Sequence, residues 1–221
     1  MSPIVVMKIT KGYLSVAIVL VILLIDQITK IWVKTHFYIG ESVEITPWFF
    51  IHFIENNGMA FGMEIGSKYI LTAFRIAVVA GLTWYLSKTC RRDDIPTGYI
   101  ICLSAIIAGA AGNIIDCMFY GLIFNNPYPP EVATLFPGDG GYAPIMLGRV
   151  VDMLYFPLFS FDWPQWIPII GGKNFLFFQP VFNIADAAIS VGMVALVIFY
   201  SKYLGSHYQP DSPENQKTPE Q

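Results

Sequence analysis

Charged residues are scarce in this chain of 221 residues. Asp, Glu, Lys and Arg make up only 13% of it, whereas soluble domains carry about 25%. Apolar residues make up 55%, and the mean hydropathy is +0.55. The formal net charge of −3 indicates little, because the acidic C-terminal tail partly sets it. The composition therefore excludes a soluble globular domain and gives no reason to expect a nucleic-acid partner.

The sequence also lacks the patterns that metal sites and most hydrolases require. Cys90, Cys102 and Cys117 show no paired spacing, and the three histidines are isolated from one another. We therefore expect neither a disulfide framework nor a metal or other cofactor. Ser-x-x-Lys, Gly-x-Ser-x-Gly and His-Glu-x-x-His sequences are all missing. This excludes the common serine and zinc hydrolase signatures.

Long apolar runs dominate what is present. Each is about 20 residues long, enough to cross a hydrocarbon core of about 30 Å as a helix. The runs cover residues 13–33, 69–87, 97–119 and 181–201. The sequence therefore predicts an all-α membrane protein with four transmembrane helices. The apolar stretch within residues 1–25 is followed by Asp26-Gln27-Ile28-Thr29-Lys30 instead of a small-x-small cleavage site, so we expect a retained anchor that starts at Met1 or Met7.

The placement of basic residues predicts the orientation. They precede the first run, fill the loop between the second and third, and follow the fourth. These residues are Lys8, Lys11, Lys88, Arg91, Arg92 and Lys202. The positive-inside rule then places both termini in the cytoplasm and the loops 34–68 and 120–180 outside.

The outer loops differ in character. Residues 43–54 are rich in β-branched and aromatic side chains, which predicts a strand, a turn and a strand in a small extracytoplasmic sheet, or cradle, over about 37–62. Residues 121–147 are dense in Pro and Gly, which predicts an irregular loop, either a lid over a site or an addition of this lineage. Residues 155–178 are aromatic but broken by prolines, so we expect an interfacial segment on the outer leaflet and not a fifth span. We expect one membrane-embedded domain over 1–204 and a disordered cytoplasmic tail over 205–221.

Four aspartates stand where a membrane protein should not carry charge. A carboxylate within a membrane costs at least about 2.5–3.5 kcal/mol, so each is a candidate functional residue. A rise of 1.5 Å per residue places Asp26, Asp116 and Asp186 about 20, 27 and 24 Å from the cytoplasmic ends of their spans. Asp152 directly follows the outer loop. All four are therefore expected to meet in the outer half of the bilayer.

Two of these acids have a structural interpretation. Asp26 and Lys30 are spaced i, i+4 and can neutralise each other on one helix face. Asp116 can brace the end of the third span, with Asn113 as its partner. Arg75, deep in the second span, is interpreted as a counter-ion to an acid or as a side chain that snorkels outward.

Asp152 and Asp186 fit a catalytic role better. Neither has a basic residue one helical turn away, unless the segment that holds Arg149 is helical. Two facing carboxylates share one proton, so that one can activate a water while the other polarises a carbonyl. The alternative is a proton-coupled transporter or channel, although the sequence shows no inverted repeat and no polar path to the cytoplasm. A membrane scaffold leaves the four acids unexplained.

Five short motifs resemble, in order, those of bacterial lipoprotein signal peptidase (signal peptidase II) across residues 12–204. They are Asp26-Gln27-Ile28-Thr29-Lys30, Asn56-Asn57-Gly58-Met59-Ala60-Phe61-Gly62, Gly112-Asn113-Ile114-Ile115-Asp116, Val150-Val151-Asp152 and Phe182-Asn183-Ile184-Ala185-Asp186. The resemblance implies an aspartic endopeptidase of the cytoplasmic (inner) membrane. It would cut prolipoproteins before a diacylglyceryl-modified cysteine, would be blocked by the peptide antibiotic globomycin, and is expected to be monomeric in membrane lipid.

The resemblance also implies residue roles. The catalytic pair falls on Asp152 and Asp186. The remaining positions support the site or the substrate: Asn56, Gly58, Ala60, Phe61, Asn113, Asp116, Asn183, Asp26 and Lys30. Cys117 stands where the family usually has an arginine, and Arg149 is a candidate to replace it.

Overall fold

The computed structural model describes residues 10–57 and 68–204, and its long helices are those that the sequence predicts. They are α1 (Lys11–His36), α2 (Lys68–Thr89), α3 (Thr97–Ile115) and α5 (Ile184–Tyr200). A π-helical turn, η2 (Asp116–Tyr120), and the short helix α4 (Gly121–Ile123) extend α3, and a 3₁₀ turn, η3 (Ser201–Tyr203), ends α5. The four long helices, together with these extensions, are long and apolar enough to cross a membrane, which confirms the predicted fold class. The predicted tail, 205–221, lies outside the described residues.

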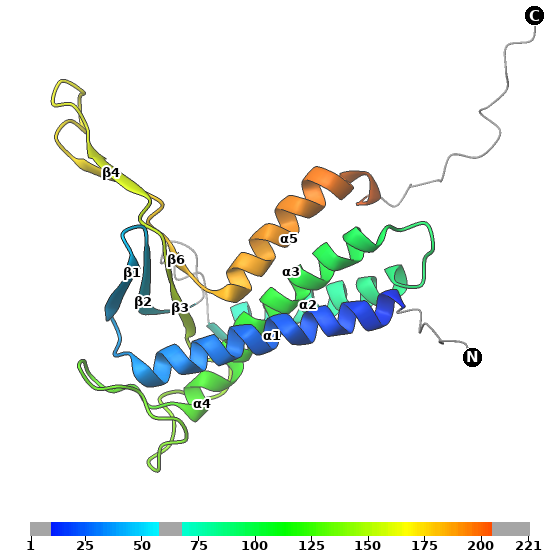
Figure 1. Ribbon diagram of the computed structural model, residues 1–221. Coiled ribbons are helices and arrows are strands. Elements are labelled where there is room, and N and C mark those ends of the chain that lie inside the picture. The colour runs from blue at the N-terminus through cyan, green and yellow to red at the C-terminus, as the bar shows by residue number, and fades with distance from the viewer. Residues whose placement is uncertain (1–9, 58–67, 205–221) are drawn as a thin grey trace, which may run out of the picture.

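Helix α3 is the central helix of the bundle, and it packs against α1, α2 and α5 (Figure 1). In its most apolar stretch 56% of the residues are buried, against 11–17% in the other three helices. Glycine makes the close packing against α5 possible, because a Cβ added at Gly109 would lie 2.2 Å from the carbonyl oxygen of Ala185. The other helices expose apolar side chains over much of their length, as expected of surfaces that face lipid.

A small antiparallel sheet stands at one end of the helices (Figure 1). Its strand order is β1 (Ser42–Thr46), β2 (Phe49–Asn56), β3 (Val150–Tyr155) and β6 (Val181–Phe182). The predicted strand, turn and strand over 43–54 are confirmed as β1 and β2. Strands β3 and β6 were not predicted, and they place Asp152 in a sheet, opposite Ile54 of β2.

A second, two-stranded sheet projects from the first. It consists of β4 (Phe159–Asp162) and β5 (Asn174–Phe177) and fills much of the segment predicted to be interfacial. The predicted irregular loop is largely irregular, and its residues hydrogen-bond back to the end of the third span. Examples are the amide of Gly148, which donates to the Cys117 carbonyl at 2.8 Å, and that of Ala143, which donates to the Gly121 carbonyl at 2.9 Å.

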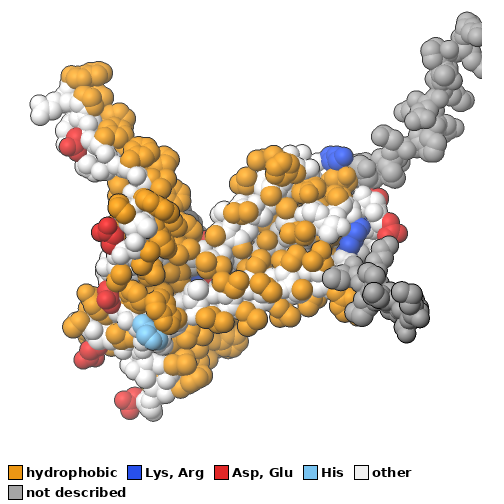
Figure 2. Space-filling view, viewed as in Figure 1, with side chains coloured by type: hydrophobic (Ala, Val, Ile, Leu, Met, Phe, Trp, Pro, Cys, Tyr) orange, Lys and Arg blue, Asp and Glu red, His pale blue; other side chains and the backbone are white. Residues whose placement is uncertain are grey.

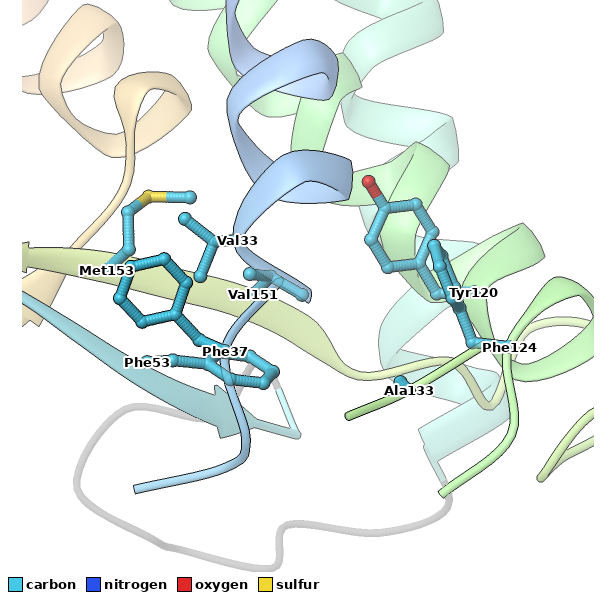
Figure 3. Packing of buried hydrophobic residues seen from close by; sticks show 8 residues of the cluster. All are labelled: Val33, Phe37, Phe53, Tyr120, Phe124, Ala133, Val151 and Met153. Carbon is cyan, nitrogen blue, oxygen red and sulfur yellow. The ribbon is translucent and has the colours of Figure 1, made fainter. Parts of the chain in front are cut away.

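An apolar core joins the sheet to the ends of α1 and α3 (Figure 3). Its buried members are Val33, Phe37, Phe53, Tyr120, Phe124, Ala133, Val151 and Met153. Alternate residues of a strand point to opposite faces. Because Val151 and Met153 face this core, Asp152 between them points to the other side of the strand, toward the start of α5.

Candidate active site

Asp186 is positioned by the first turn of α5. Asn183 is the N-cap residue, and its Oδ1 accepts a hydrogen bond of 2.9 Å from the backbone amide of Asp186. In return, Asp186 Oδ2 accepts a bond of 3.4 Å from the amide of Asn183. This capping box satisfies amides that a helix start leaves free, and it fixes the carboxylate at the helix N-terminus.

Asp152 is held against the same cap from strand β3. The Nδ2 group of Asn183 donates to Asp152 Oδ1 at 2.6 Å, and Asn56 of β2 donates to the other carboxylate oxygen. Asp152 is buried, and burial together with the negative charge of Asp186 raises its pKa to about 7. The two aspartates therefore lie close enough for the charge of one to act on the other, and both accept hydrogen bonds from Asn183.

Asn113 of α3 hydrogen-bonds both Asp186 and the cap residue Asn183. Its Nδ2 donates to Asp186 Oδ1 at 2.8 Å, while its Oδ1 accepts from Lys30 at 2.9 Å and from Asn183 at 3.2 Å. An ammonium group can only donate, so the atom of Asn113 that faces Lys30 must be the oxygen. The N–H groups of Asn113 are thereby directed at the carboxylate of Asp186.

Asn113 also contacts a fully buried ion cluster, which consists of Lys30, Asp26 and Asp116. The ammonium of Lys30 lies 2.9 Å from Asp26 Oδ2 and 2.7 Å from Asp116 Oδ2. Asp26 Oδ1 accepts from the backbone amide of Ala185 at 3.0 Å, and Asp116 Oδ2 accepts from that of Val151 at 3.4 Å. The cluster thus holds Ala185 and Val151, which directly precede Asp186 and Asp152 in the sequence.

The structure brings most of the predicted site residues together. Asn56, Asn113, Asp152, Asn183 and Asp186 form one hydrogen-bonded group, and the predicted i, i+4 pair of Asp26 and Lys30 is observed. Gly58, Ala60 and Phe61 lie outside the described residues.

Two expectations about partners need correction. Asn113 bonds Asp186 and Lys30, whereas Asp116 bonds Lys30 and Gln27. Arg149 directly precedes strand β3, so the condition that its segment be helical is not met. Its guanidinium contacts Glu55 at 3.2 Å and Asn126 at 3.1 Å.

The guanidinium that reaches Cys117 is that of Arg75, which lies 3.7 Å from the sulfur. Arg75 also lines a cavity of about 300 Å³ between α2, α3 and α5, together with Asn113 and Asp186. The rest of its lining is apolar: Phe74, Val78, Val79, Ala110 and Ile189. Asp186 therefore faces a mainly apolar groove that has the Arg75 guanidinium in its wall, and the interpretation of Arg75 as a counter-ion to an acid stays a prediction.

Sequence reasoning also missed Gln27. Its Nε2 donates to Asp26 at 3.0 Å and to Asp116 at 2.9 Å, while its oxygen accepts from Tyr120 at 3.1 Å. The signal was present in the first motif, directly after Asp26. Nothing in the sequence marked Tyr120, because an isolated buried tyrosine has no spacing pattern.

The fold and the site together define an integral membrane protein with a carboxylate pair at one end of its helices. The family model described as "Signal peptidase (SPase) II" matches residues 18–202. The chain belongs to the signal peptidase II family, and it is a membrane peptidase. This family does not support the transporter alternative.

Two relatives agree with this assignment, and a solved structure shares the fold. The lipoprotein signal peptidase of Porphyromonas gingivalis is 46% identical over 195 residues, which cover 88% of this chain and 86% of that protein. That of Amoebophilus asiaticus is 33% identical over 198 residues, covering 86% and 78%. A bacterial membrane enzyme solved at 2.3 Å shares the fold with a TM-score of 0.58 and 23% identity, covering 90% of this chain and 93% of that one.

Proposed function

We propose that this protein removes signal peptides from prolipoproteins by cutting on the N-terminal side of a diacylglyceryl-modified cysteine, with Asp152 and Asp186 as the catalytic pair. The observation that carries the proposal is the way in which the two carboxylates are held. Each accepts from a neutral asparagine amide, Asp152 from Asn183 and Asp186 from Asn113. Such a pair can retain one shared proton at neutral pH, as catalysis by two aspartates requires.

In the proposed reaction, the ionised aspartate takes a proton from a water molecule. The water oxygen attacks the scissile carbonyl carbon, and the protonated aspartate donates a hydrogen bond to the carbonyl oxygen. Collapse of the tetrahedral intermediate breaks the C–N bond, and the aspartate that accepted the proton transfers it to the leaving amine. Asn56 and Asn183 keep Asp152 in position during these steps.

The groove between α2, α3 and α5 fits the proposed substrate. Its lining is apolar apart from Arg75, Asn113 and Asp186. A signal peptide and the acyl chains of the modified cysteine are themselves apolar and reach the enzyme from within the bilayer. We therefore place the scissile bond at the polar end of this groove, beside Asp186.

We infer that the site opens toward the outer leaflet of the cytoplasmic membrane. The end of the bundle opposite the sheet holds Lys11, at the start of α1, Arg91 and Arg92, between α2 and α3, and Lys202, after α5. On the face drawn in Figure 2, Lys and Arg side chains gather at that end and most acidic side chains at the sheet end. The positive-inside rule then puts the sheet and the carboxylate pair outside.

The test is cleavage of a diacylglyceryl-modified prolipoprotein in nanodiscs, followed by gel shift. Asp152→Asn and Asp186→Asn should each abolish cleavage, whereas Asp139→Asn, on the exposed loop, should match the wild type. EDTA should leave the wild-type rate unchanged. Robust cleavage by either variant of the pair would show that the catalytic residues are assigned wrongly.

A further inference from the structure

The hairpin of β4 and β5 has two chemically different faces. Phe159 pairs with Phe177 and Phe161 with Phe175, so four phenylalanines share one face. The intervening pairs, Ser160 with Leu176 and Asp162 with Asn174, share the other. There, Asn174 donates a hydrogen bond of 2.8 Å to Asp162.

The aromatic face is built of packed rings. The ring centroids of Phe159 and Phe177 lie 4.7 Å apart, and those of Phe161 and Phe175 lie 5.2 Å apart. Trp163 extends the face, at 5.0 Å from Phe161 and 5.9 Å from Phe175. These rings stay open to the surroundings, since Phe159 is 54% exposed and Phe177 41%. A two-stranded hairpin is at best marginally stable in water, so this face needs an apolar partner.

The position of the hairpin indicates which partner this is. Figure 1 shows the hairpin and α5 diverging from the neighbourhood of β6 as the two arms of a V. Because α5 spans the membrane, lipid fills the space beside it, and the hairpin bounds that space at the sheet end. In Figure 2 apolar side chains line the edge of the hairpin that faces the V, and an acidic side chain lies on the opposite edge.

We propose that the aromatic face of β4 and β5 lies on the bilayer surface at the sheet end of the helices, with its rings at the boundary between head groups and acyl chains. Trp and Tyr concentrate at this depth in membrane proteins, and surface-bound segments bury Trp, Phe and Leu there. Between Phe159 and Phe177 the only charged residues are Asp162 and Lys173, which cancel. The contact therefore depends on apolar burial and not on attraction to anionic lipid. It adds a membrane contact to the four spans and is independent of the proposed cleavage.

The test compares the two faces at neighbouring positions. Phe161→Cys and Ser160→Cys are made in the full-length chain with Cys90, Cys102 and Cys117 replaced, and each is spin-labelled in phosphatidylcholine nanodiscs. Power saturation measures collisions with oxygen, which dissolves in lipid, and with a water-soluble nickel chelate. The ratio of oxygen to nickel collisions should be several-fold higher at position 161 than at position 160. Replacing part of the lipid with phosphatidylglycerol should not change it.

A second measurement leaves the aromatic face intact and guards against disruption by the label. Brominated phosphatidylcholine should quench the fluorescence of Trp163, obtained as the difference between wild type and Trp163→Phe. Equal nickel access at positions 160 and 161, with no quenching of Trp163, would overturn the proposal. Protection of position 161 from both reagents, with dimers in the nanodisc, would instead assign the face to a second copy of the chain and also overturn it.

Discussion

The ammonium nitrogen of Lys30 lies 2.9 Å from Oδ1 of Asn113, and this contact joins the buried ion cluster to the proposed catalytic pair of Asp152 and Asp186. Because the lysine can only donate, it determines that Asn113 presents its N–H groups to Asp186. Lys30 is shared between two aspartates and this amide oxygen. Lys30 thus determines, through Asn113, the hydrogen bond that Asp186 accepts.

Asn113→Leu should therefore lower kcat with little change in fold. The variant removes the donor to Asp186, and a hydrogen bond to a charged group is worth about 1.5–3 kcal/mol, or roughly a tenfold to hundredfold rate change. The measurement is kcat for a lipidated prolipoprotein, with Asn126→Leu in the outer loop as the matched control. An unchanged kcat in Asn113→Leu would show that the bond to Asp186 has no catalytic role.

Asn183→Ser separates the helix cap from the support of Asp152. Serine is also a good N-cap residue, so α5 should still begin in the same place and the melting temperature should change little. The amide that donates to Asp152 is lost, and this bond lowers the pKa of Asp152. Its pKa should rise further, so the alkaline limb of the kcat/KM profile should move to higher pH. A profile shifted to lower pH, or not at all, would contradict this role.

The raised pKa of Asp152 also predicts how stability depends on pH. The folded state holds this proton up to about pH 7, whereas a carboxyl with the ordinary value of 3.8 loses it much earlier. The folded state therefore binds more protons than the unfolded state between these values, and stability falls as the pH rises through this window. Thermal unfolding in detergent at pH 5 and pH 8 measures the fall.

Asp152→Asn is the matched variant, because it keeps the shape and removes the titration. Its stability should fall less than that of the wild type between the two pH values, by an amount on the order of a few kcal/mol. At pH 8 it should be the more stable protein, although the proposed function predicts that it does not cleave. Parallel pH dependence in both proteins would mean that Asp152 titrates in the folded state much as it does when unfolded.

The close contact of α3 with α5 predicts a contrast between two glycines. A Cβ at Gly109 would lie 2.2 Å from the Ala185 oxygen, one residue before Asp186, whereas a Cβ at Gly81 of α2 would have no neighbour within 4 Å. Gly109→Ala should destabilise the protein by about 1–3 kcal/mol, the usual cost of overpacking, and should lower activity by displacing α5. Gly81→Ala should be neutral or slightly stabilising. Equal melting temperatures for the two variants would contradict this account of the interface.

The sequence predicts those parts of this fold that depend on local composition. The apolar runs are long enough to specify four membrane helices by themselves. The spacing of Asp26 and Lys30 specifies their ion pair, because both belong to one helix. The strand, turn and strand over 43–54 are also local, since their two strands are neighbours along the chain.

The remainder depends on contacts between distant segments. Strand β3 pairs with β2, about a hundred residues earlier, so nothing near Asp152 shows that it belongs to a sheet. The partner of Asn113 is chosen by the position of Asp186 on another helix. In the hairpin, Phe159 and Phe177 pair across a long connection that gives no short turn signal. These are the features for which sequence reasoning was incomplete or wrong.

Substitutions of two arginines near the site should have different effects on the kinetics, and the comparison tests which arginine binds the substrate. Arg75 lines the groove beside Asp186, so we expect its guanidinium to donate to a carbonyl oxygen of the bound substrate. Arg75→Gln should raise KM about tenfold, the scale of one hydrogen bond from a charged group, with a smaller effect on kcat.

Arg149→Gln should leave both constants close to those of the wild type, because Arg149 bonds Glu55 and Asn126. It should also keep most of its stability, since Glu55 retains its buried contact with Lys34. The reverse result, with kinetics that depend on Arg149 and not on Arg75, would mean that the substrate approaches from the loop side of the sheet and not through the groove between α2, α3 and α5.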